Sequence, residues 1–122
     1  MFDRSRAVPD IKQPKPDDKS VRDSRTIEVS IVIPTRDEAP NIVPVLDRLG
    51  RSLTGLAVEV LFADDSDDAT PAAVLNCAGT TPFPVRLVHR NPGERRGGQS
   101  GAVLAALTEA HGEWIVVMDG DL

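Results

Sequence analysis

The residues of this sequence with the clearest chemical potential are acidic side chains in three short clusters. These clusters are Asp37-Glu38, Asp64-Asp65, and the pair Asp119 and Asp121 on either side of Gly120. Each cluster follows an apolar stretch that is typical of a β-strand. Two unit charges about 4 Å apart repel by roughly 4 kcal/mol at an effective dielectric constant near 20, so grouped carboxylates need a counter-charge. One such cluster alone is more typical of a turn, but three together indicate a cation site.

The ligand types predict which cation this site would take. Carboxylate oxygens without a Cys/His cluster favour Mg²⁺ or Mn²⁺ over zinc. Cys77 is the only cysteine, so it can form neither an internal disulfide nor a zinc cluster. Magnesium-type ions take one or two protein carboxylates and leave their other positions to phosphate oxygens. Asp119 and Asp121 fit that role, because Gly120 lets the backbone approach a ligand closely.

Alternating strands and helices would carry the acidic clusters to one place. The apolar patterns predict strands over 27–33, 57–63 and 85–89 and a last strand from Trp114, which we expect to be buried on both faces. This alternation predicts an α/β domain with a parallel sheet. The carboxyl ends of parallel strands lie at one edge, where ligands bind, so we expect the three clusters to meet there.

Helix boundaries follow from caps and apolar spacing. Asn41 and Thr70 are expected N-caps, which places Pro44 in a first turn, and Pro34 is expected to end the first strand. A third helix is expected from about Ser100 to Ala110, after a glycine-containing loop. Its inward residues are predicted to be Val103, Leu104 and Leu107.

Several polar residues remain open to more than one interpretation. Arg90, Arg95 or Arg96 could help the glycine-rich loop to receive an anion, or that loop could be a flexible surface segment. His89 is expected to be a strand-end residue, and His111 a cation near a helix C-terminus. Neither histidine has a visible partner for acid–base work.

Composition excludes some classes of protein. A net charge of -5 and an aromatic content of 3% argue against a nucleic-acid-binding surface, which needs basic residues and stacking rings. Residues 1–25 are proline-rich and charged and are expected to form a disordered leader, leaving a domain over 26–122. No apolar run reaches transmembrane length, which predicts a cytoplasmic protein and leaves attachment to a membrane surface open.

Three motifs taken together resemble family 2 glycosyltransferases with the GT-A fold. The segment 30–42 resembles their Pro-Thr-Tyr-Asn-Glu-x-x-Asn-Ile signature, 62–70 their Asp-Asp motif, and 117–122 their Asp-x-Asp motif. Within the family, the chain looks most like the polyprenol-phosphate (dolichol-phosphate) mannosyltransferases. Their His-Arg pair, glycine-rich helix start and final strand match residues 88–122 in order.

The resemblance implies the Rossmann-like nucleotide-binding half of a GT-A domain, a mostly parallel sheet with flanking helices that is truncated after its fourth strand. Its implied partners are a nucleotide-sugar donor and a lipid-phosphate acceptor at a membrane surface. Its implied site residues are Pro34, Thr35 and Glu38 in the nucleotide pocket, Asp64 with Asp65 beside it at the base or ribose, and Asp119 with Asp121 at the Mg²⁺ or Mn²⁺ of the donor diphosphate.

The implied reaction is an inverting, metal-dependent transfer of a hexose, with mannose from GDP-mannose passing to a polyprenol or dolichol phosphate. A UDP-sugar donor is the alternative within the class. The alternative outside it is a non-catalytic nucleotide-binding fragment or interaction module, because family domains continue beyond the Asp-x-Asp motif. Arg36 stands where the family usually has an aromatic residue, Asp37 where it has Asn, and Ser66 where it has Gly. These differences concern the donor's identity more than the fold.

Overall fold

The computed structural model describes residues 27–120, in which strands and helices alternate along the chain as predicted. The expected leader over 1–25 and the residue Asp121 lie outside the described residues. None of the helices within 27–120 is long and apolar enough to cross a bilayer. The strands are β1 (Val29–Thr35), β2 (Val58–Asp64), β3 (Val85–His89) and β4 (Trp114–Val117); the helices are α2 (Ala39–Ser52), α3 (Thr70–Cys77), the 3₁₀ turn η2 (Pro92–Glu94) and α4 (Gly98–Leu107).

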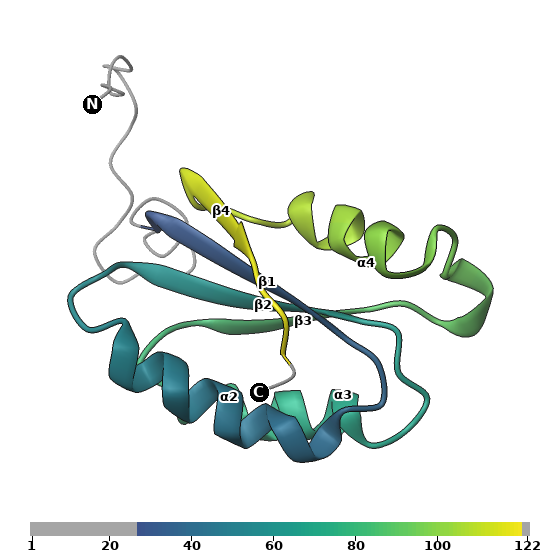
Figure 1. Ribbon diagram of the computed structural model, residues 1–122, viewed down its shortest axis with the longest axis horizontal. Helices are drawn as coiled ribbons and strands as arrows, with labels where there is room; N and C mark the ends of the chain where they lie inside the picture. Colours follow the sequence, from purple (N-terminus) through teal and green to yellow (C-terminus); the bar gives the residue numbers. More distant parts are fainter. Residues whose placement is uncertain (1–26, 121–122) are drawn as a thin grey trace.

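The four strands form one parallel sheet in the order β3-β2-β1-β4. Helices α2 and α3 lie on one face of this sheet and α4 lies on the other (Figure 1). This arrangement confirms the predicted α/β fold. Because β4, β1 and β2 are neighbours, the segments that follow these three strands leave the sheet at the same edge.

Two apolar layers hold the helices to the sheet. Under α2 and α3 the core includes Ile33, Phe62 and the buried residues of α2, which are Ile42, Val45, Leu46 and Leu49. Under α4 it is made by Val32, Leu61 and Ala63 against Ala102 and Ala106.

The predicted inward face of α4 was partly wrong. Leu104 is 62% exposed, whereas Val103 and Leu107 pack at the margin of the core. The residues that face the sheet are Ala102 and Ala106, whose small side chains allow the helix to approach it closely.

The prediction that Pro34 ends the first strand was wrong. Pro34 lies inside β1, opposite Ala63. The carbonyl of Val32 accepts a hydrogen bond from the N–H of Met118, so the backbone polar groups of Val32 point toward the β4 side of β1. The backbone nitrogen of Pro34, two residues later, points to the same side. The pairing of β1 with β4 ends at Val32, so the missing N–H of Pro34 costs no ladder hydrogen bond.

The helix starts also differ from the predicted caps. Helix α2 begins at Ala39 after Glu38, so Asn41 is not its cap and Pro44 lies inside the helix. Helix α3 begins at Thr70, whose N–H donates to Oδ1 of Asp68 at 2.8 Å. The N-cap residues are Glu38 and Ala69, and neither makes a side-chain cap hydrogen bond. The hydroxyl of Thr70 is instead engaged by the N–H of Glu38 and by Oδ1 of Asp68.

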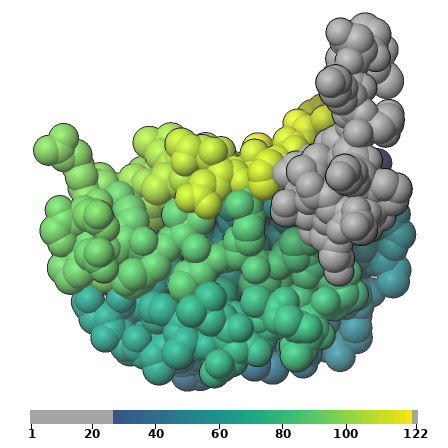
Figure 2. All heavy atoms as spheres, turned by 180° about the vertical axis from the view of Figure 1, so that it is seen from behind, coloured from purple at the N-terminus to yellow at the C-terminus, as the bar shows by residue number. Residues whose placement is uncertain are grey.

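The last strand is exposed, and the prediction that it is buried on both faces was wrong. Trp114 is 69% exposed and Val117 is 52% exposed, because β4 is the edge of the sheet and pairs only with β1 among the described strands. Figure 2 shows the segment around β4, in yellow, at the surface along the upper side of the molecule. An apolar run predicts a strand but cannot say how many of its faces are covered.

Candidate functional site

A cavity of about 280 Å³ opens at the carboxyl ends of β4, β1 and β2, where the acidic clusters were expected to meet. One carboxylate from each cluster lines it, namely Glu38, Asp65 and Asp119. The full lining is Pro34, Thr35, Arg36, Glu38, Ala63, Asp65, Gln99, Ala102 and Asp119. The structure therefore brings five of the seven predicted site residues to one cavity, leaving Asp64 outside it and Asp121 beyond the described residues.

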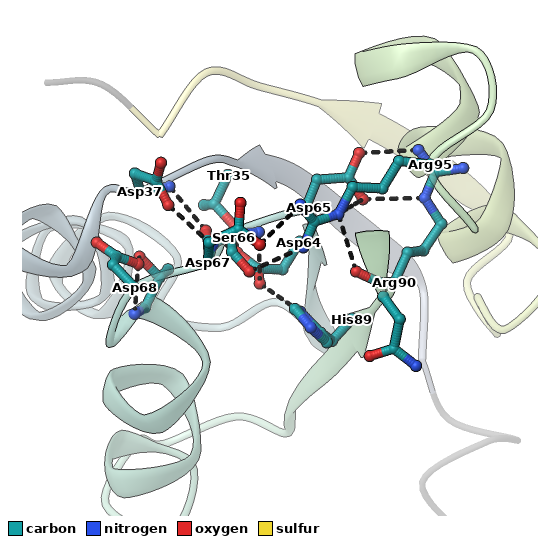
Figure 3. A network of polar contacts seen from close by, with 12 residues as sticks. Thr35, Asp37, Asp64, Asp65, Ser66, Asp67, Asp68, His89, Arg90 and Arg95 are labelled. Carbon is teal, nitrogen blue, oxygen red and sulfur yellow. Dashed lines mark hydrogen bonds and ion pairs between the residues drawn. The ribbon is translucent and has the colours of Figure 1, made fainter. Parts of the chain in front are cut away.

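Asp64 does not reach the cavity, because its side chain is fully buried in a polar network (Figure 3). Its Oδ1 accepts from the hydroxyls of Thr35 and Ser66, both at 2.6 Å. Its Oδ2 accepts from the N–H of Ser66 at 3.2 Å and lies 2.7 Å from Nδ1 of His89. All the acceptor positions of this carboxylate are thus engaged by protein groups, which gives Asp64 a role in holding Thr35 at the cavity.

Asp65 is the member of the pair that faces the cavity, and it is held by two arginines. Nε and Nη2 of Arg90 donate to its two carboxylate oxygens at 2.9 and 2.8 Å, and Nε of Arg95 lies 4.0 Å away. The hydrogen bonds from Arg90, with the charges of Arg90, Arg95 and Arg36, lower the pKa of Asp65 below its ordinary value. Asp65 is therefore ionised and fixed in orientation at neutral pH.

The loop after β1 is held to the loop after β2 by hydrogen bonds. Asp37 has a positive φ of 54°, a conformation that Asp and Asn tolerate better than most residues. Its N–H donates to the hydroxyl of Ser66 at 2.7 Å, and its Oδ1 accepts from the N–H of Asp67 at 2.9 Å. The N–H of Glu38 donates to the hydroxyl of Thr70 at 2.9 Å. These contacts fix the position of Glu38 at the mouth of the cavity.

The start of α4 is held beside Asp65 by the same arginine. Arg90 donates to the carbonyls of Arg96 and Gly98 at 3.0 and 2.9 Å. Gly101 is required there, because a Cβ on it would collide with the carbonyl oxygen of Arg96. This geometry brings Gln99 to the cavity lining. Arg90 and Arg95 are engaged with acidic groups and carbonyls, so neither offers an unpaired charge to an anion.

Asp119 is the predicted metal ligand that the described residues contain. Between residues 27 and 120, no group of three or more His, Cys, Asp or Glu side chains is placed to hold a metal ion. A site with one or two carboxylates still fits Mg²⁺ or Mn²⁺, because these ions complete their shells with phosphate oxygens and water. The oxygen chemistry at Asp119, open to the cavity, is compatible with such an ion.

A second polar network, which the sequence did not reveal, lies at the opposite end of the sheet. Glu59 is 2% exposed and accepts from the hydroxyl of Ser30 at 2.6 Å and from the N–H of His111 at 2.7 Å. Nη2 of Arg86 donates to it at 3.1 Å. Both histidines thus have carboxylate partners, contrary to the prediction. The available signal was a lone Glu inside an apolar strand, which normally requires a partner when buried.

Known proteins resemble this chain in sequence. The model of the family described as Glycosyl transferase family 2 matches residues 30–122. A dolichol-phosphate mannosyltransferase of Pyrococcus furiosus is 34% identical over 97 residues, covering 79% of this chain and 26% of that protein. One from Saccharomyces cerevisiae is 32% identical over 100 residues, covering 80% and 36%.

The fold of this chain is also similar to that of a solved glycosyltransferase structure. The chain superposes with a TM-score of 0.64 and 36% identity on a mannosyltransferase from Pyrobaculum calidifontis in complex with GDP-Man and Mn²⁺, covering 77% of this chain and 27% of that one. The agreement extends the likeness from sequence to the GT-A nucleotide-binding half of the fold. The chain spans about a quarter to a third of the length of these relatives.

Proposed function

The chain belongs to glycosyl transferase family 2, and we propose that its cavity holds the nucleotide-sugar donor of a metal-dependent mannosyl transfer. The observation that carries this proposal is the convergence of Glu38, Asp65 and Asp119, from three neighbouring strands, on one cavity. The complex of the Pyrobaculum mannosyltransferase with GDP-Man and Mn²⁺ supports the same type of donor here.

The nucleoside would lie against Pro34, Thr35 and Ala63, at the ends of β1 and β2. Asp65 would accept hydrogen bonds from the base or the ribose, since its carboxylate is ionised and oriented by Arg90. Asp64 would contribute indirectly, by holding Thr35, rather than by contacting the nucleotide. Glu38 would complete the nucleotide pocket from the start of α2.

Asp119 and Asp121 would hold Mg²⁺ or Mn²⁺ beside the donor diphosphate. When bound, the ion would supply positive charge that offsets the acidic cavity and stabilises the departing diphosphate. The chain's own contribution among the described residues is to hold Asp119 after the end of β4, in the lining of the same cavity. Gly120 lies against Ile33 of β1, where a Cβ would come within 2.8 Å of the Ile33 Cγ2 atom, so the close approach next to Asp119 requires glycine.

The acceptor we propose is a polyprenol or dolichol phosphate, presented at the cytoplasmic face of a membrane. The names of the Pyrococcus and Saccharomyces relatives support a dolichol phosphate acceptor and a mannosyl group. A phosphate acceptor is already ionised at neutral pH, so an inverting transfer to it has little need of a general base. We assign no residue between 27 and 120 to the acceptor.

Calorimetry of donor binding tests this proposal. We expect the chain to bind GDP-mannose in Mn²⁺, more weakly in EDTA, and to bind UDP-sugars less tightly. The double variant Asp119→Ala/Asp121→Ala should lose the metal-dependent part, and circular dichroism should show that it remains folded. A folded wild-type chain that binds no nucleotide in Mn²⁺ would rule out the donor site. Preference for a UDP-sugar would keep the site and correct the donor.

A further inference from the structure

Arg36 supplies a positive charge that the mechanism described above leaves unused. It follows β1, is exposed, and lines the cavity together with Glu38, Asp65 and Asp119. Three carboxylates around a cavity repel an anionic ligand, so a cation among them changes what the cavity can bind. Among the residues that the structure describes, Arg36 is the only Arg or Lys in the lining of this cavity.

Arg90 and Arg95, which lie beside Asp65, already form ion pairs with carboxylates of the protein. Arg90 makes a bidentate pair with Asp65, and Arg95 contacts Asp67 at 2.9 Å. Within residues 27–120, the guanidinium of Arg36 has no hydrogen bond or ion pair to a carboxylate. The charge of Arg36 nevertheless acts on the cavity, because it contributes to lowering the pKa of Asp65. Arg36 is therefore close enough to act on a ligand beside Asp65.

We propose that Arg36 is the protein's own cationic contact for the diphosphate of the nucleotide-sugar, so that part of diphosphate binding is independent of the metal ion. The inference rests on the proposed donor site and adds a residue to it. A guanidinium suits this task because it offers planar, bidentate donation to phosphate oxygens. In its place, an aromatic residue could provide a stacking surface but no charge.

Binding of guanosine, GMP and GDP in EDTA tests the inference without the metal. For the wild-type chain we expect affinity to rise from guanosine to GDP. In Arg36→Gln the GDP-to-guanosine affinity ratio should fall about tenfold, as expected for a lost charge-assisted hydrogen bond, while guanosine binding stays the same. Arg36→Lys should retain part of the ratio, because it keeps a point charge. Arg48→Gln, at an exposed site on α2 away from the cavity, is the matched control.

The outcomes separate this inference from the proposed function. An unchanged ratio in Arg36→Gln would show that the guanidinium only contacts solvent, and an equal loss for guanosine and GDP would place it on the base. Either result would overturn the inference and leave the donor site standing. A folded wild-type chain that binds no member of the guanosine or uridine series would overturn both. Binding of a short-chain polyprenyl phosphate is measured as well. If Arg36→Gln weakens the binding of this lipid and leaves GDP binding unchanged, Arg36 contacts the phosphate of the acceptor, which would overturn the inference.

Discussion

Arg90 donates hydrogen bonds to both carboxylate oxygens of Asp65, from Nε at 2.9 Å and from Nη2 at 2.8 Å, and the same guanidinium donates to the carbonyl of Gly98. One side chain therefore connects the end of β3, the end of β2 and the start of α4. These are the segments that place Asp65 and Gln99 in the cavity lining. The geometry of the donor pocket depends on this contact, although Arg90 itself is absent from the lining.

Replacing Arg90 with Lys should weaken nucleotide binding about tenfold, because Lys cannot make the bidentate pair that orients Asp65. Calorimetry with GDP-mannose and Mn²⁺ measures this loss. Arg48→Lys, at an exposed position on α2, is the control and should bind like the wild type. If Arg90→Lys binds the nucleotide with full affinity, the pair does not position Asp65 for the donor.

Replacement by Asn should affect stability at Asp64 and nucleotide binding at Asp65. Asp64→Asn should lower the free energy of unfolding by about 2 kcal/mol, because a buried amide group would face donors that now meet a carboxylate oxygen. Asp65→Asn should leave stability closer to wild type and weaken nucleotide binding about tenfold, since that carboxylate faces the cavity. Urea unfolding and calorimetry on both variants separate the effects. The reverse pattern would contradict the assignment of Asp65 to the ligand.

Glu59 should make stability depend on pH. Burial raises the pKa of Glu59, but hydrogen bonds from Ser30 and His111 and the charge of Arg86 outweigh it, so the pKa lies below its ordinary value of 4.5. The folded state then binds fewer protons than the unfolded state. The resulting stability is fully present above pH 4.5 and is lost as the pH falls through the lowered pKa.

The variant Glu59→Gln tests this dependence. It should cost about 2 kcal/mol at pH 7, since it removes the charge of a buried carboxylate that accepts from Ser30, Arg86 and His111. Arg86 would keep its second, more exposed ion pair with Glu109. The variant should also flatten the decline of stability that sets in as the pH falls below 4.5, because the lowered pKa of Glu59 no longer contributes. Urea titrations at several pH values give both quantities. An equally steep decline in the variant would show that other carboxylates control the acid response.

The exposed edge strand should promote self-association. Val116 is 46% exposed on β4, next to backbone groups that no other described strand pairs. Val116→Lys should weaken association about tenfold, because a charged side chain opposes edge-to-edge pairing. Sedimentation equilibrium measures the change. Leu75→Lys, at a 60% exposed position on α3, is the matched control, and an equal effect of both variants would show that general surface polarity is responsible.

The strand and helix types could be predicted because their apolar periods are clear and the turns carry Gly or Pro. The shared edge of the acidic clusters followed from parallel topology alone. The separate roles of Asp64 and Asp65 could not be predicted, since they depend on which side chain turns toward His89 and which toward Arg90. Period-2 alternation places adjacent residues on opposite faces but does not say which face is open.

Two further differences have the same kind of cause. Leu104 is a stronger apolar signal than Ala102, yet Ala102 is buried against the sheet and Leu104 is exposed. The burial of Glu59 depends on Ser30, Arg86 and His111, which come from three separate segments. A single sequence reports local preference, and long-range partners of this type are fixed only by the tertiary fold.

The most direct test of the donor site is broadening of backbone amide signals by bound Mn²⁺ in the presence of GDP-mannose. We expect the signals of Glu38, Asp65, Gln99 and Asp119 to broaden, because their side chains line the same cavity. The signals of Val58 and Val85, at the amino ends of β2 and β3, should remain sharp. The Asp119→Ala/Asp121→Ala variant should abolish the effect. Broadening centred on any other part of the chain, or GDP-mannose binding without broadening at these four residues, would contradict the account.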